Sequence, residues 1–329
     1  MAGSALYFTA PGSVETEPID GGPPDRDEVA VETVASAISA GTELLVYRGQ
    51  APTEIPRDKT IEALSGEFSY PMRYGYAAVG EVQAVGEHVS NEWAGRTVFS
   101  FTPHQTRFTA SPDVLVPVPP EMDAETATLI PSVETATTLA LDLGARLGEE
   151  IVVFGAGVIG LCLVRLLAAF PLDRLVVVDP IERRRTVARE LGADETIHPD
   201  DGAEGIDGFD AAVELSGRPA VLDDAVSAVG YGGRVIVGSW YGTKRAPIDL
   251  GGRFHRDRIT IRSSQVSTIA PELRGRWDTE RRISTVLDRL DGSLAETLIS
   301  HRVPFERAEE AYELLDGRPE EALQVVLTY

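Results

Sequence analysis

In the first third of the chain, apolar and polar residues alternate over short stretches rich in β-branched side chains, which is typical of half-buried strands. Gly, Pro and Asn separate these stretches. The pattern predicts strands within 28–39, 77–89 and 96–101. The loop from Gln50 to Tyr74 is long, and long irregular loops in compact domains are often functional; we expect it to shape a binding pocket.

The pattern changes near residue 122. Residues 123–148 carry helix formers at helical spacing and end in glycine, which predicts helix. Beyond them, near-continuous apolar runs alternate with amphipathic stretches, as in parallel strands covered by helices on both faces. Strands are predicted at 150–155, 174–179, 209–215, 232–240 and 258–264, and helices at 157–170, 180–192 and 219–230. The tail is predicted as helix, helix and strand at 278–292, 305–317 and 322–329.

Bulk properties limit the class of protein. The 329 residues suffice for two domains, and 43% hydrophobic residues is an ordinary globular share. No apolar run reaches the ~20 residues of a membrane span, and residues 1–12 lack the regions of a signal peptide. A cytoplasmic protein is expected. The single cysteine, Cys162, allows no intrachain disulfide, and its apolar surroundings predict a buried thiol.

The charge balance is strongly acidic, with a formal net charge of −22. Nucleic acid and anionic membranes are not expected as partners, because both would repel the chain. Lys59 and Lys244 are the only lysines, so arginine supplies 28 (30 − 2) of the basic residues. Such a surface resembles that of proteins from salt-accumulating cells, where salt screens self-repulsion. We expect halophilic origin; an ordinary acidic cytoplasmic protein is the alternative.

A glycine motif between a predicted strand and a predicted helix carries the clearest chemistry. VVFGAGVIG has GxGxxG spacing, and Asp179 ends the next predicted strand. In a dinucleotide site the glycines permit a tight turn, backbone approach to the pyrophosphate and close helix packing. A glycine-rich turn without a ligand is the alternative. The predicted cofactor contacts are Gly155, Ala156, Gly157, Val158, Ile159, Gly160, Asp179 and Arg184.

The Asp179 carboxylate favours NAD(H), because it can accept from the ribose hydroxyls and would repel the 2′-phosphate of NADP(H). Arg183, Arg184 and Arg185 could soften that repulsion, or could form a solvated helix face. Comparable affinity for both cofactors in a titration would defeat the NAD preference.

Further segments resemble the medium-chain dehydrogenase/reductase family over essentially the whole chain. GTELLVYRG, YGYAAVGEVQAVGEHV and GRTVFSF resemble its N-terminal GroES-like domain. GARLGEEIVVFGAGVIG resembles its domain junction and nucleotide motif, GGRVIVG its fifth Rossmann strand and PFERAEEAYELLDG its closing segment. Within the family, GTELLVYRG and FTPH are most similar to a branch that includes the bacteriochlorophyllide 3-hydroxyethyl dehydrogenases.

The resemblance implies an α/β fold, a Rossmann doubly wound parallel sheet plus a β-rich GroES-like domain. The expected domains are a GroES-like substrate and catalytic domain at 1–122, a Rossmann NAD(P)-binding domain at 123–270, and a C-terminal return at 271–329 that completes the first. It also implies an active site in the cleft between the domains and a homodimer.

The zinc members of the family hold their metal with ligands from three motifs, and this chain departs from all three. Ala40, Tyr76 and either Ile130 or Pro131 stand where the resemblance places ligands, and the four-cysteine lobe is missing. The five histidines are scattered. Zinc needs three or four N, S or O ligands in fixed geometry, so no zinc is expected. Hydrogen-bond donors must then polarise the substrate.

Three residues are candidates for that work. The resemblance puts Thr42 where the family has the hydroxyl that passes the substrate proton; a turn threonine is the alternative. Tyr76 could donate to a carbonyl oxygen, or act as an acid if a cation lowered its pKa; a packing aromatic is the alternative. His104 could supply or remove a proton from a loop beside the cleft, or be merely exposed. Glu134 could shape the cleft or stabilise a helix dipole.

The expected function is zinc-independent, NAD(P)-dependent oxidoreduction, with reversible hydride transfer between nicotinamide and an alcohol or carbonyl carbon. Thr42 and Tyr76 would hold the oxygen, and His104 would handle the proton. Reduction of an activated C=C bond is one alternative, and a non-catalytic NAD(H)-binding sensor or structural protein is another. Turnover that is lost in Thr42→Ala or Tyr76→Phe, with NADH binding intact, would favour the enzyme.

The acidic composition generates a prediction about salt. The melting temperature should rise from low to multimolar KCl, because added cations screen the self-repulsion of an acidic surface. Thermal unfolding across that range measures it, and a melting temperature that gains nothing from salt would sink the halophilic interpretation.

Overall fold

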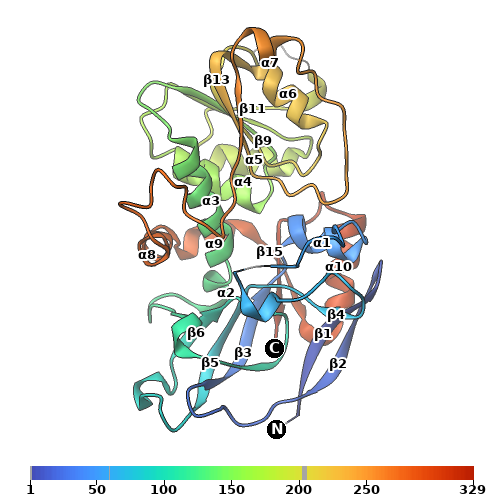
Figure 1. Ribbon diagram of the computed structural model, residues 1–329, viewed down its shortest axis with the longest axis vertical. Coiled ribbons are helices and arrows are strands. Elements are labelled where there is room, and N and C mark those ends of the chain that lie inside the picture. Colours follow the sequence, from blue (N-terminus) through green and yellow to red (C-terminus); the bar gives the residue numbers. More distant parts are fainter. Residues whose placement is uncertain (1, 59, 202–205) are drawn as a thin grey trace. The chain divides into compact units, whose positions relative to one another are not determined.

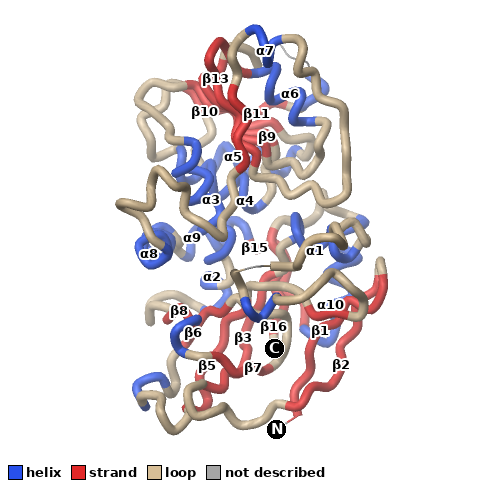
Figure 2. The backbone as a smooth tube through the Cα atoms, viewed as in Figure 1, coloured by secondary structure: helices blue, strands red, loops and turns tan. Residues whose placement is uncertain are grey.

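The computed structural model describes residues 2–58, 60–201 and 206–329, so Lys59 lies outside the described residues. The chain divides into two compact units, Met1–Pro131 with Leu290–Tyr329 and Ser132–Arg289. Figure 1 traces both units, and Figure 2 distinguishes their helices from their strands. The C-terminal segment therefore folds as part of the first unit.

A parallel sheet organises the second unit. Its strands, in spatial order, are β11 (Glu195–Ile197), β10 (Arg174–Val178), β9 (Glu150–Phe154), β12 (Phe209–Glu214), β13 (Val229–Val237) and β14 (Thr260–Ser263). Counted along the chain from β9, the order is 3-2-1-4-5-6, which is that of a Rossmann doubly wound sheet. The predicted α/β fold is confirmed. The strand order reverses beside β9, so the loop after β9 lies where such folds bind ligands.

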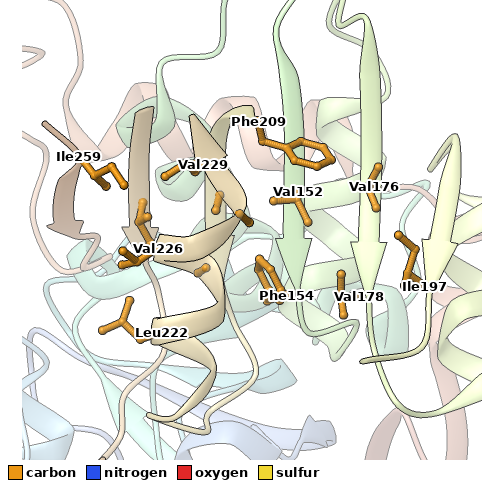
Figure 3. Packing of buried hydrophobic residues seen from close by; sticks show 14 residues of the cluster. Val152, Phe154, Val176, Val178, Ile197, Phe209, Leu222, Val226, Val229 and Ile259 are labelled. Atoms are coloured by element: carbon orange, nitrogen blue, oxygen red, sulfur yellow. The ribbon is translucent and has the colours of Figure 1, made fainter. Parts of the chain in front are cut away.

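Helices alternate with these strands along the chain. They are α3 (Ile130–Leu143), α4 (Val158–Leu167), α5 (Glu182–Glu190), α6 (Val221–Ala228), α7 (Arg253–Arg256) and α8 (Thr279–Arg289), with a 3-10 turn at Pro199–Asp201. Figure 3 shows Val152 and Val176 from adjacent strands, and Leu222 and Val226 of α6, in one apolar cluster. Burying such a side chain contributes about 1.5–3 kcal/mol, which explains the near-continuous apolar strands.

The first unit is built mainly from antiparallel β-structure, with β15 and β16 paired in parallel. One sheet has the order β15 (Ile299–Pro304), β16 (Gln324–Thr328), β3 (Val29–Ala37), β5 (Ala78–Val85), β6 (Thr97–Ser100) and β8 (Leu115–Pro117), with β7 (Arg107–Ala110) also paired to β3. A smaller sheet has the order β2 (Ser13–Asp20), β1 (Ala2–Ala10) and β4 (Met72–Arg73). The C-terminal strand β16 pairs antiparallel with β3, so the tail completes the larger sheet.

Short helices complete the first unit. They are α1 (Ala40–Tyr47), α2 (Ala124–Ala127), α9 (Gly292–Leu298) and α10 (Ala308–Gly317), with 3-10 turns at Glu62–Leu64, Asn91–Trp93, Pro112–Val114 and Phe305–Arg307. None of the helices in the described part of the chain combines the length and apolar character needed to cross a bilayer.

Two predictions of local structure were incomplete. Residues 123–148 form α2 and α3 rather than one helix: Asp123 caps α2 by accepting from Thr126 N at 2.8 Å, and α3 then starts afresh with Pro131 in its first turn. The tail contains α9 and β15 in addition to the predicted helix, helix and strand. Asp291, which accepts from Leu294 N at 2.9 Å, caps α9 and was the overlooked start signal.

The predicted buried thiol is confirmed. Cys162 lies on α4 with 1% of its surface exposed. Burial raises the pKa of the Cys162 thiol to about 12, so it stays protonated and acts as a small apolar side chain.

A buried ion pair joins α3 and α8 within the second unit. Arg282 Nη2 donates to Glu134 Oε1 at 2.6 Å, and both side chains are about 95% buried, with 4% and 5% exposed. Burial raises the pKa of the Glu134 carboxyl, and Arg282 opposes that rise. Glu134 therefore serves a structural pair, and not the helix-dipole role considered from sequence.

Replacing Arg282 by Met should lower the unfolding free energy by about 3–5 kcal/mol, because a buried carboxylate loses its partner. The folded-state pKa of Glu134 lies above its unfolded value, so deprotonation favours unfolding. The loss should be full above the folded-state pKa and fade as the pH falls towards the unfolded value of about 4.3. Denaturant titrations at pH 8 and pH 5 measure this. Arg289→Met, at an exposed position on the same helix, is the matched control; equal losses in both variants would contradict the role of the pair.

Candidate functional site

The turn between β9 and α4 requires two of its glycines. Gly155 has φ +102°, and a Cβ there would lie 2.7 Å from the Leu215 backbone. A Cβ on Gly160 would lie 2.1 Å from the Gly155 carbonyl oxygen. Both approaches are closer than a side chain tolerates, so the strand, the turn and the helix can pack this tightly only with glycine.

Gly157 has a different role in the same turn. No atom lies within 4 Å of a Cβ built on it, so the space outside the start of α4 is open. Gly157 is the N-cap of α4 and no side chain caps the helix. The first intrahelical bond is made by Leu161 N to Gly157 O at 2.8 Å, which leaves the preceding amides at a helix N-terminus suited to phosphate.

Asp179 fastens this turn to the end of β10. It is 4% exposed; its Oδ2 accepts from Ala156 N and its Oδ1 from Ile181 N, both at 2.8 Å. Sequence reasoning assigned Asp179 to the ribose and missed this structural role. A carboxylate oxygen has two lone pairs, so ribose hydroxyls can still bind it.

Three of the four features of a dinucleotide site thus lie together in the second unit: the glycine turn, the open helix N-terminus and the acid after the neighbouring strand. These residues fit a dinucleotide. The fourth, Arg184, is half-buried on α5, and its predicted cofactor contact stays a prediction. Arg185 donates to the Asp179 carbonyl oxygen, at 2.6 Å.

In the first unit, the start of α1 gathers three hydroxyl groups, from Ser39, Thr42 and Tyr76, which we call the hydroxyl cluster. The Tyr76 phenol donates to Ser39 Oγ, and Thr42 is among the groups that lower the pKa of the Tyr76 phenol. All three side chains are half-buried. The structure therefore brings together Thr42 and Tyr76, which the sequence nominated separately, and adds Ser39.

Burial raises the pKa of the Tyr76 phenol, with Glu43 adding to the rise and the two hydroxyl partners opposing it. The groups that shift the pKa of the Tyr76 phenol do not include a cation, which would lower it. Tyr76 is therefore a neutral hydrogen-bond donor at pH 7, and the acid role considered from the sequence is not supported.

Beneath the hydroxyl cluster lies a row of hydrogen-bonded side chains, which we call the buried chain. Glu43, with no exposed surface, accepts at Oε2 from Tyr312 at 2.5 Å and lies 3.0 Å from His104 Nε2. His104 Nδ1 lies 2.7 Å from Ser36 Oγ, which lies 2.8 Å from the Tyr329 hydroxyl. Burial raises the pKa of both phenols, so they remain donors.

His104 differs from the expectation of a loop histidine beside a cleft. It has no exposed surface, and both ring nitrogens already have partners. Gly75 makes this possible, since a Cβ there would lie 2.5 Å from the imidazole ring. His104 consequently cannot contact a substrate, and the direct proton transfer predicted for it is wrong.

The donor side chains near the hydroxyl cluster do not suit a metal ion. Within residues 2–58, 60–201 and 206–329, no three His, Cys, Asp or Glu side chains gather as metal ligands. Glu43 and His104, the one such pair beside the hydroxyl cluster, bind each other. Their remaining neighbours are neutral hydroxyls, which are poor ligands for zinc. The residues present do not fit a zinc site.

Sequence reasoning missed Ser36, Ser39, Glu43, Tyr312 and Tyr329. Glu43 carried a usable signal, an acid followed directly by the apolar run Leu44–Val46 in a short helix. The tyrosines carried none, because they reach Glu43 and Ser36 from sequence positions far away, on α10 and at the end of β16.

Comparison with known proteins finds dehydrogenases among the proteins that are similar to this chain. Residues 158–281 match the model of the family described as "Zinc-binding dehydrogenase". The chain is 25% identical to D-guloside 3-dehydrogenase of Escherichia coli K12, over 92% of this chain and 93% of the relative. It is 27% identical to (R,R)-butanediol dehydrogenase of Bacillus subtilis 168, over 70% and 73% of the two chains.

Among solved structures, a short chain alcohol dehydrogenase from E. coli CFT073, complexed with cofactor NADH, has a TM-score of 0.80 at 19% identity, covering 100% of this chain and 99% of its own. At that identity the likeness shows the fold. The sequence relatives are dehydrogenases, and this chain is an alcohol dehydrogenase-like oxidoreductase.

The glycine turn offers a matched pair of variants. Gly157→Ala should fold normally but bind NADH at least ~10-fold more weakly, equivalent to about 1.4 kcal/mol, because its methyl group enters the open space at α4. Gly160→Ala should instead lower the melting temperature, because its methyl group meets the Gly155 carbonyl. Thermal unfolding and NADH titration of both variants measure this; unchanged NADH affinity in Gly157→Ala would remove the turn from the cofactor site.

Proposed function

We propose that this chain is a zinc-independent, NAD(P)-dependent oxidoreductase that transfers hydride reversibly between nicotinamide and an alcohol or carbonyl carbon. The observation that carries the proposal is the hydroxyl cluster, in which the Tyr76 phenol donates to Ser39 Oγ near Thr42. The dinucleotide cofactor supplies the hydride chemistry when bound. The chain then has to bind the cofactor, hold the substrate oxygen and move one proton.

The hydroxyl cluster suits the oxygen-holding role. Neutral hydroxyl donors stabilise the negative charge that develops on a carbonyl oxygen as hydride reaches its carbon. They are half-buried, so they exchange fewer hydrogen bonds with water than exposed groups do. The raised pKa of Tyr76 keeps its proton in place, which fits hydrogen-bond donation better than acid catalysis.

Zinc independence is proposed from the chemistry of the donors. The positions where the family's zinc ligands are expected hold Ala40 and Tyr76, and the nearby carboxylate and imidazole satisfy each other. The likeness to the zinc-lacking branch that includes the bacteriochlorophyllide 3-hydroxyethyl dehydrogenases supports the same view.

The remaining features of the proposal concern cofactor, substrate and setting. The Asp179 carboxylate supports NAD over NADP. The sequence relatives named above act on alcohols or polyols, so these compounds are the first candidates to test as substrates. A cytoplasmic homodimer of halophilic origin is part of the proposal, supported by the acidic composition and by the family resemblance.

A turnover panel tests the proposal. We expect one or more alcohols, polyols or carbonyl compounds, assayed with NADH, NADPH and their oxidised forms at low and high salt, to be converted. Thr42→Val and Tyr76→Phe should each lower kcat by about tenfold or more, because each removes a hydrogen-bond donor of the oxygen site. NADH affinity should not change.

Turnover confined to enones would favour C=C reduction instead. Tight NADH binding without turnover of any panel member would favour the non-catalytic protein.

A further inference from the structure

We propose that Glu214, a buried acid at the end of β12, is a specificity residue that strengthens the binding of NAD⁺ relative to that of NADH. This role rests on the proposed function, since it requires a nicotinamide cofactor at the glycine turn. The sequence motifs assign Glu214 no role. Its place beside the turn and the neutral groups around its carboxylate point to this one.

The residues that follow Glu214 pack directly against the glycine turn. A Cβ on Gly155 would lie 2.7 Å from backbone atoms of Leu215 and Ser216, and Leu215 N donates to Phe154 O, at the end of β9, at 2.8 Å. The strand order reverses between β9 and β12, and sheets of this kind bind ligands at the carboxyl ends of the strands there. Glu214 therefore lies at the edge of the sheet to which the glycine turn assigns the cofactor.

The strand order also indicates which half of a dinucleotide belongs to β12. Asp179 follows β10, on one side of β9, and suits the adenosine ribose. The open start of α4 follows β9 itself and suits the pyrophosphate. Because β12 lies on the other side of β9, the nicotinamide half is the part that remains for Glu214 and its neighbours. The nicotinamide ring carries a positive charge in NAD⁺ and none in NADH.

The Glu214 carboxylate has no exposed surface, and the hydrogen-bond partners that the described residues supply to it are all neutral. Its Oε1 accepts from Ser216 N at 2.7 Å and from the Ser216 hydroxyl, and its Oε2 accepts from the Tyr241 hydroxyl at 2.5 Å. Three donors favour the ionised carboxylate. Burial and Glu214 both raise the pKa of the Tyr241 phenol, so Tyr241 keeps its proton and remains a donor.

The neutral donors stabilise the Glu214 carboxylate without cancelling its charge. An acid paired with an arginine, such as Glu134 with Arg282, presents little net charge to its surroundings. Hydrogen bonds from amide and hydroxyl groups leave the full negative charge of Glu214 in place. Charges inside a protein interact more strongly than charges in water, because the effective dielectric constant is lower. A ring that becomes positive on oxidation is therefore favoured at this edge of the sheet.

A cation from the loop after β13 acts at the same edge. Lys244 Nζ donates to the Gly217 carbonyl oxygen, and Ser239 Oγ accepts from Gly217 N at 2.9 Å. The loops after β12 and β13 are thus joined through Gly217. The Lys244 ammonium repels a positive ring, so its effect on the two redox forms is opposite in sign to that of Glu214.

Affinity titrations with NAD⁺, NADH and ADP test this role and need no substrate. In Glu214→Gln, the dissociation constant of NAD⁺ divided by that of NADH should rise about fivefold or more, because a unit charge is lost at an effective dielectric constant of about 20. The affinity for ADP, which lacks the nicotinamide half, should not change. Lys244→Met should lower the same ratio.

Two control variants separate the charge of Glu214 from its structural contacts. Tyr241→Phe removes a donor but keeps the carboxylate, so the ratio of the two dissociation constants should stay at its wild-type value. Asp210→Asn removes an exposed acid near the opposite end of β12. It should also leave the ratio unchanged, because salt screens an exposed charge.

A wild-type ratio in Glu214→Gln would overturn the role, as would equal losses of affinity for NAD⁺, NADH and ADP, which would make Glu214 a structural residue only. If Glu214→Gln fails to fold, Lys244→Met carries the test, and an unchanged ratio there would overturn the role. A wild-type chain that binds neither NAD⁺ nor NADH removes the proposed function as well. That outcome is distinct from a chain that binds both forms with a ratio indifferent to Glu214.

Discussion

Glu43 is a carboxylate without exposed surface, and such a group is tolerated in a protein interior only when hydrogen-bond donors surround it. One donor is local, the amide of Ser39, which directly precedes α1. The other two come from distant parts of the sequence: His104 follows β6, and Tyr312 is on α10. The requirement to satisfy one acid thus ties the C-terminal segment to the N-terminal sheet and fixes the start of α1, where the hydroxyl cluster is assembled.

This arrangement helps to explain why the chain departs from the zinc-site motifs. A histidine and a carboxylate next to the hydroxyl cluster could have served as metal ligands. Here the histidine and the carboxylate bind each other. The neutral hydroxyls of Ser39 and Tyr76 form the adjoining cluster. In the second unit, Asp179 likewise combines two roles. It accepts hydrogen bonds that hold the glycine turn in place, and its oxygens keep lone pairs that a ribose could bind. In both units a buried acid accepts hydrogen bonds from backbone amides and so fixes a turn, before α1 in the first unit and before α4 in the second.

Much of the fold could be predicted from the sequence because its signals are local. The apolar runs at Ile151–Phe154 and Leu175–Val178, and the glycines beside them, specify strand, turn and helix within a few residues. The candidate site was predictable only in part. Thr42 and Tyr76 were found because motif positions mark them, but His104 was misread, because its burial depends on the absent side chain of Gly75 and on partners far along the chain. Ser39 was recognised only from its hydrogen bond with Tyr76, a residue far along the chain.

We propose that hydroxyl groups of this chain, and not a metal ion, hold the substrate oxygen during hydride transfer. The most direct measurement is the rate of a single hydride transfer in protein stripped by a strong chelator, with metal content determined on the same sample. We expect an unchanged rate at a metal content far below one ion per chain, and no gain on adding zinc. A rate that falls with the metal and returns when zinc is restored would contradict it.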